Sequence, residues 1–155
     1  MTLSLVLYFL GLLTITFCCY QKKLHLFEIF FIWMTVWLIT HFISTILIIN
    51  FRVLEVSSGY GNFGVHFFKR FILFPQVIVI MFDIYLRLRT TLLRILSLIA
   101  TVFLLSGLEF LFIYLGVLIN LHHRFIFSLL EWSITVLLAL LTWKWYRYKR
   151  LMRYS

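Results

Sequence analysis

Hydrophobic residues form long uninterrupted runs along this chain, and short polar joints separate the runs. Five runs can be marked, at about residues 2–20, 29–51, 71–86, 95–119 and 125–146. A helix that crosses about 30 Å of hydrocarbon needs about 20 apolar residues. The pattern predicts an all-α integral membrane bundle of about five transmembrane helices, a single domain over 1–155 with an outer linker at 52–70 and a basic tail at 147–155.

The third run is the shortest, and it leaves a four-helix alternative open. Residues 71–86 contain Asp83, and Pro75 falls in the expected first helical turn, where a missing N–H costs little. Without this run, four helices would place both termini inside the cell. We favour five spans because FILFPQVIVIMF would otherwise be a long apolar loop.

The number of Lys and Arg residues differs between the two sides of the predicted membrane. The first joint, the third joint and the C-terminal segment from Lys144 onward hold ten of them, against four in the second and fourth joints. By the positive-inside rule, the N-terminus is outside and the C-terminus is cytoplasmic. The tail is cytoplasmic in the four-helix alternative as well.

Composition agrees with a lipid environment. The chain is 64% hydrophobic and only 12% charged, which is far from the values of soluble domains. A net charge of +9 could indicate nucleic acid, but the basic residues sit at the ends of apolar runs, where anionic headgroups attract them. We therefore expect a lipid bilayer as partner and no nucleic acid.

The stretch GYGNFG, residues 59–64, matches the G-x-G-x-x-G fingerprint of dinucleotide-binding loops. The fingerprint works only between a strand and a helix of a βαβ unit, and here membrane segments flank it. We expect no nucleotide, and interpret 57–64 as a flexible outer hinge. Asp83 is better explained by an interfacial ion pair with Arg87, one turn later.

Three ionisable residues fall inside predicted spans at similar depth: His41, Glu109 and Glu131. A charge at the bilayer centre costs about 2.5–3.5 kcal/mol on insertion scales, so such residues face protein or water. Their helices carry small and polar residues on one face, which lets helices approach closely. We expect these three faces to pack together and the three side chains to form an intramembrane polar cluster.

Two interpretations of Glu109 stay open. It is a proton or cation site, or it makes an interhelical hydrogen bond, to His41 or a serine, that locks the bundle. Glu131 could instead reach Arg124 in an interfacial salt bridge.

The sequence offers little for catalysis or metal binding. No nucleophile-elbow pattern is present, and His122, His123 and Arg124 are interpreted as an outer cap because no further ligand stands at a metal-binding spacing. We expect no enzyme, no catalytic residues, no metal and no cofactor.

The second half of the chain, from HFFKRFILFP through SGLEFLFIYLGVLINLHH to EWSITVLLALLTWKWYRYKR, resembles an uncharacterised family of small multi-pass membrane proteins from spore-forming Firmicutes. The matching positions are Pro75, Glu109, Trp132 and the region 143–150. The resemblance implies a bacterial plasma membrane and assigns no activity.

Two functional classes follow. The first is a non-enzymatic packing or accessory component of a membrane assembly, which binds another membrane protein or itself. The alternative is a small proton- or cation-coupled transporter or channel subunit that uses His41, Glu109 and Glu131.

Overall fold

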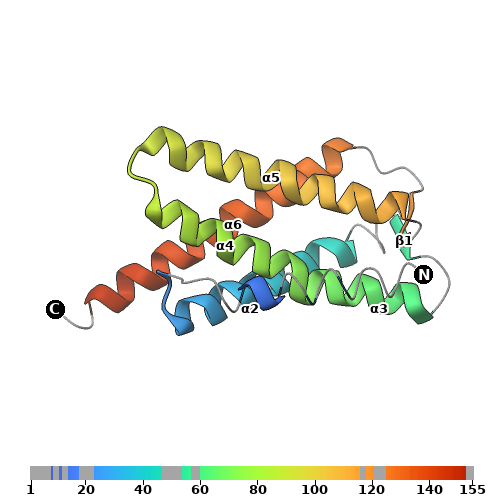
Figure 1. Cartoon of the computed structure of the whole chain (residues 1–155), viewed down its shortest axis with the longest axis horizontal. Coiled ribbons are helices and arrows are strands. Elements are labelled where there is room, and N and C mark those ends of the chain that lie inside the picture. Colours follow the sequence, from blue (N-terminus) through green and yellow to red (C-terminus); the bar gives the residue numbers. More distant parts are fainter. Residues whose placement is uncertain are drawn as a thin grey trace.

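The long helices form one antiparallel bundle. A computed structural model describes residues 8, 11, 14–17, 23–46, 54–56, 60–115, 118–120 and 125–152. The elements in chain order are α2 (Leu26–Thr45), β1 (Leu54–Val56), α3 (Tyr60–Phe68), η2 (Lys69–Leu73), α4 (Phe74–Arg87), α5 (Thr91–Tyr114), β2 (Leu118–Asn120) and α6 (Phe125–Met152). α2 and α5 each pack against both α4 and α6, so the helices close into a ring (Figure 1).

Four helices in the described part of the chain are long and apolar enough to cross a membrane. They cover Leu26–Thr45, Gly64–Arg87, Thr91–Tyr114 and Phe125–Lys149. Large apolar side chains such as Phe30 and Leu137 stand exposed on the outside, which suits lipid and not water. The predicted class, a helical membrane bundle, is confirmed. Most of the expected first span at 2–20 lies outside the described residues, which include only 8, 11 and 14–17 of it.

The predicted linker at 52–70 is wrong over most of its described length. Tyr60 to Phe68 are α-helical, and this helix continues without a break to Arg87. Tyr60 to Gly64 are therefore helical, and the hinge interpretation is wrong for them; membrane helices accept glycine more readily than soluble ones do. Lys69 and Arg70 misled the prediction because charges usually mark the end of a span, whereas here both are buried inside it.

Pro75 lies in the interior of this long helix and not in its first turn. A proline has no N–H to donate to the carbonyl four residues earlier, and its ring crowds that carbonyl. The chain adapts with one π-helical turn, η2, in which the Phe74 N–H donates to the Lys69 carbonyl. Local π turns of this kind let membrane helices accommodate proline.

The non-basic end of the bundle is closed by a short β-ribbon. β1 and β2 are antiparallel, and Glu55 pairs with Ile119 in the register. The fourth predicted run, 95–119, therefore extends too far, since α5 ends at Tyr114 and residues 118–120 form β2. Because β1 has an antiparallel partner, β1 and α3 do not belong to a parallel βαβ unit in the described chain. Asp83 is also about 35 Å along the same helix from Tyr60.

Aromatic side chains of α4 and α6 fill the centre of the bundle. The Phe82 and Trp143 rings stack with centroids 5.3 Å apart, and Phe74 meets Trp132 edge-on at 4.4 Å. All four are buried. Aromatic pairs add to the close packing that holds membrane helices together, because lipid gives no hydrophobic drive between them.

We expect Phe82→Ala to lower the thermal unfolding midpoint in detergent by several degrees. The loss of free energy should fall below the about 3–5 kcal/mol typical of water-soluble cores, because only packing is lost in lipid. Leu96→Ala, at a position half exposed to lipid, is the matched control. Equal midpoints for the two variants would contradict the assignment of this core.

Candidate functional site

Arg70 is the centre of a buried charge cluster to which four helical segments contribute. Its Nη1 donates to the Thr40 carbonyl on α2 at 2.7 Å. Its Nη2 lies 3.8 Å from Glu109 Oε1 on α5 and 3.6 Å from Glu131 Oε1 on α6. Arg70 itself belongs to η2. We call Lys69, Arg70, Glu109 and Glu131 the Arg70 cluster.

All members of the Arg70 cluster lie at one depth. Arg70 and Glu131 are each six residues from the non-basic ends of Gly64–Arg87 and Phe125–Lys149, and Glu109 is five residues from the end of α5. With a rise of about 1.5 Å per residue, each lies about 8–9 Å inside the end of its spanning segment. The antiparallel order of the helices brings these positions to the same layer.

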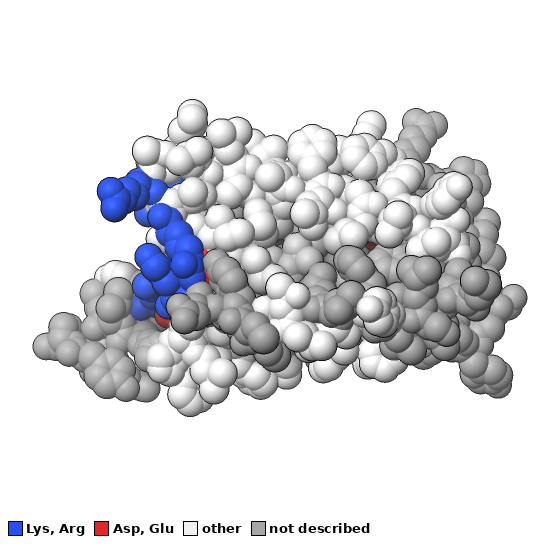
Figure 2. Space-filling view, viewed as in Figure 1, with Lys and Arg blue, Asp and Glu red and all other residues white. Residues whose placement is uncertain are grey.

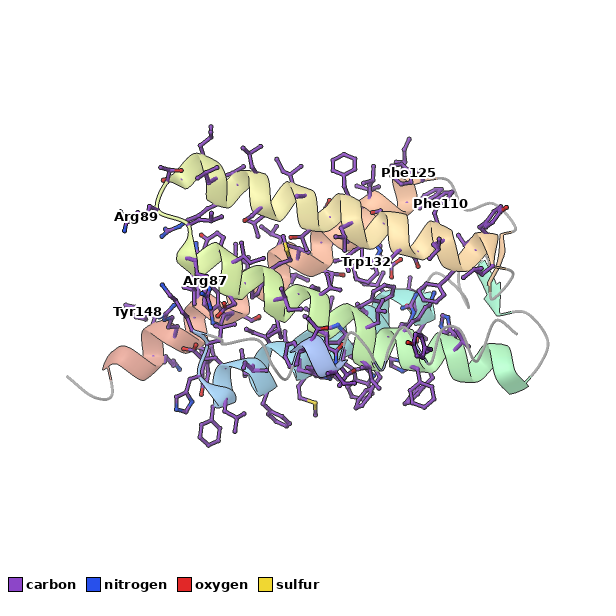
Figure 3. The ribbon with its side chains drawn as sticks, in the orientation of Figure 1. Arg87, Arg89, Phe110, Phe125, Trp132 and Tyr148 are labelled. Atoms are coloured by element: carbon purple, nitrogen blue, oxygen red, sulfur yellow. The ribbon has the colours of Figure 1, made fainter. Side chains whose placement is uncertain are left out.

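Glu109 is fully buried and joins α5 to α6. Its Oε2 accepts hydrogen bonds from Ser128 Oγ at 2.6 Å and from Trp132 Nε1 at 2.9 Å. In Figure 3, Trp132 lies between the ribbons of α5 and α4. Ser128, Glu131 and Trp132 project to the same side because they are spaced by three and four residues on α6.

Lys69 brings a second cation into the same layer. The side chain is completely buried, and its Nζ lies 5.1 Å from the Phe112 ring centroid and 5.8 Å from that of Phe74. The cluster thus holds two cations and two anions and is formally neutral, which lowers the cost of placing it in hydrocarbon.

Several polar atoms in this layer lack a hydrogen-bond partner among the described residues. They are Lys69 Nζ, Arg70 Nε, both carboxylate oxygens of Glu131 and the buried Ser106 Oγ. His66 Nδ1, one turn before Arg70, shares this property. Unsatisfied buried polar atoms are rare in proteins, and a group of them marks a place where water, a proton or an ion can bind.

Two successive cations, Lys69 and Arg70, are both buried in η2. Neighbouring residues of an ideal α-helix point about 100° apart. Both can face protein here because this helix is the most buried of the four spans and packs against α2 and α5. π turns occur often at functional positions of helices.

His41 does not join the cluster, contrary to the prediction. The buried positions of α2 are spaced by four residues, namely Glu28, Ile32, Val36, Thr40 and Ser44. His41 follows this stripe by one residue, is exposed, and stacks on Trp37 with centroids 6.0 Å apart. The prediction took Trp33 and Trp37 as the interior face of α2. Each of them follows a buried residue of the stripe by one position, so the predicted face was one residue off.

The other predicted residues fall in different places. Arg87 Nε lies 2.8 Å from Asp83 Oδ2, as the spacing predicts, and Asp83 Oδ1 also accepts from the Lys23 and Leu24 backbone N–H groups. Asp83 therefore ties α4 to the start of α2. His122, His123 and Arg124 lie outside the described residues.

Sequence reasoning missed Lys69 and Arg70. The signal was present, since two glutamates within apolar spans require cationic partners. Because charges were assumed to mark the end of a span, Lys69 and Arg70 were assigned to the linker.

No family model, no curated protein and no solved structure matches this chain. The class of protein, a helical multi-pass membrane protein, rests on the four apolar helices.

We expect Arg70→Gln to destabilise the protein by about 3–5 kcal/mol, because two buried carboxylates lose their shared partner. Adding Glu131→Gln should recover part of this loss, since the double variant restores a neutral cluster. Thermal unfolding in detergent measures both effects, with the exposed Arg89→Gln as control at about the wild-type value. Additive losses in the double variant would show that the two residues are not coupled.

Proposed function

We propose that the protein is a non-enzymatic component of a membrane assembly, in which the Arg70 cluster fixes how the helices pack. The observation that carries this proposal is that α2, η2, α5 and α6 all contribute to the contacts of Arg70. A fixed bundle presents defined outer faces to a second membrane protein or to another copy of itself.

The outer faces support this role. An apolar groove of about 650 Å³ runs along the first half of α2, lined by residues such as Phe27, Phe30 and Trp33, together with Phe71. Small and polar residues are used inside the bundle, whereas the outside carries large apolar side chains. A partner would contact the described helices through this apolar surface.

The second candidate is a proton- or cation-coupled transporter or channel subunit. The specific observation in its favour is that Lys69 Nζ and both carboxylate oxygens of Glu131 have no hydrogen-bond partner among the described residues. A purely structural cluster gains little from charged groups without hydrogen bonds, because apolar packing is usually at least as stabilising. In this candidate the working residues are Lys69, Arg70, Glu109 and Glu131, and His41 has no part.

Glu109→Gln separates the two candidates. The packing role predicts that this variant loses a co-purifying partner or its own oligomer, while wild-type liposomes show no ion flux above empty ones. Transport predicts that wild-type protein carries protons or cations into dye-loaded liposomes, and that Glu109→Gln abolishes the flux with assembly intact.

Glu28→Gln is the matched control for this experiment. Glu28 is also buried and carries a carboxylate, but it lies at the basic end, where Arg147 Nε is 3.9 Å away. If Glu109→Gln changed assembly and ion flux no more than Glu28→Gln does, that result would contradict both candidates.

We infer that the basic end faces the cytoplasm of a bacterial plasma membrane. Lys and Arg gather at the end where α4 turns into α5 and where α6 finishes (Figure 2). The positive-inside rule supports this orientation, and the resemblance supports the choice of membrane.

Cysteine labelling tests the orientation. In a variant with Cys18 and Cys19 replaced by Ala, Glu55→Cys should react with a membrane-impermeant maleimide on intact cells, because β1 lies at the outer end. Ser155→Cys should react only after permeabilisation. The reverse pattern would invert the proposed topology.

A further inference from the structure

The basic end of the bundle carries more cations than its acids can neutralise. Two acidic side chains lie there, and each has an arginine: Asp83 has Arg87 at 2.8 Å and Glu28 has Arg147 at 3.9 Å. Among the described residues, no ion pair within 4.0 Å engages the remaining cations, which are Lys23, Arg89, Arg94, Lys144 and Lys149.

Two of these free cations converge on one aromatic ring. Arg94 Cζ lies 5.4 Å from the Tyr85 ring centroid, and Lys144 Nζ lies 5.9 Å from the same centroid. Arg94 belongs to α5, Lys144 to α6 and Tyr85 to α4, so three helices build the site. The two positive charges are at most about 11 Å apart.

Two further contacts fix the positions of Arg94 and Tyr85. Arg94 Nε donates to the Leu88 carbonyl at 3.0 Å, which fixes the guanidinium near Tyr85. Among the described residues, no hydrogen bond engages its two terminal nitrogens. Tyr85 packs edge-on against the buried Trp143, with centroids 6.3 Å apart. Arginine with free terminal nitrogens is suited to bind a phosphate with two hydrogen bonds.

We propose that Arg94, Lys144 and Tyr85 bind the phosphate of an anionic phospholipid. The site lies at the helix ends, where headgroups lie, and basic pockets between membrane helices bind such headgroups. Exposed Ile95 and Leu141 continue from it along α5 and α6 and give the acyl chains an apolar surface. Trp145 and Tyr148, exposed near by on α6, belong to the aromatic residues typical of this level.

The test uses purified full-length protein in a neutral detergent, titrated with phosphatidylglycerol or phosphatidylcholine. We expect phosphatidylglycerol to raise the thermal unfolding midpoint and phosphatidylcholine to have a much smaller effect. Arg94→Gln/Lys144→Gln should weaken phosphatidylglycerol binding by about tenfold or more, given about 1 kcal/mol for each basic residue near a membrane surface.

The matched control, Lys23→Gln/Lys149→Gln, removes two charges from the same end but leaves the Tyr85 site intact. We expect its phosphatidylglycerol titration to stay within about twofold of wild type. Equal weakening in the two double variants would overturn the proposal in favour of a diffuse charge effect. Inorganic phosphate that reproduces the midpoint shift would show a free anion as the ligand and would also overturn it.

A second variant covers the case in which the double variant fails to fold. Lys144 is exposed, so Lys144→Gln should fold normally and weaken phosphatidylglycerol binding several-fold. Lys144→Arg, which keeps the charge, should bind as wild type does. If Lys144→Gln bound phosphatidylglycerol with wild-type affinity, the proposed site would be wrong.

Discussion

The structure depends on the contact of one guanidinium with two carboxylates in the interior of the bundle. An unpaired charge in hydrocarbon costs several kcal/mol, so Glu109 and Glu131 can stay ionised inside only if a cation reaches them. Arg70 meets this requirement from the most buried of the spanning helices. Because the partners sit on different helices, the pairing also sets the relative height of α5, α6 and the helix that contains η2. A shift of one turn, about 5.4 Å, would separate the charges and leave each uncompensated.

Pro75 and the two buried cations lie within two turns of the same helix. Pro75 cannot complete the α-helical hydrogen bond, and the resulting π turn covers Lys69 to Leu73. Lys69 and Arg70 are buried there, and the six residues from Phe74 to Val79 that follow are buried as well, because this helix packs against both α2 and α5. The burial of two neighbouring cations therefore follows from the central position of the helix, whereas the π turn accommodates the proline.

The class of fold was predictable from the sequence, and the cluster was predictable only in part. Long apolar runs indicate membrane helices directly, and the small and polar stripes of α5 and α6 correctly placed Ser106, Glu109, Ser128 and Glu131 inside the bundle. The prediction that His41 joins the cluster was wrong because a helix with apolar residues on every side gives little information about which face is buried. The prediction of a linker over residues 60–70 was wrong because hydropathy treats each charge separately. A buried ion pair instead depends on partners that are distant in sequence. Helix ends were also uncertain, since apolar residues continue from α5 into β2.

The division of charge between interior and surface explains both ends of the molecule. The acidic side chains described are Glu28, Asp83, Glu109 and Glu131; all four are buried, and each lies within 4.0 Å of an arginine. The acids thus serve the packing of the helices, and the exposed charges of the described side chains are positive. Among the described side chains, the exposed charges collect at one end, and at the other end the cations Lys69 and Arg70 are buried with the glutamates. The burial of the described acids beside arginines therefore leaves a positive surface at the basic end, and the proposed orientation and the proposed headgroup site both rest on this asymmetry.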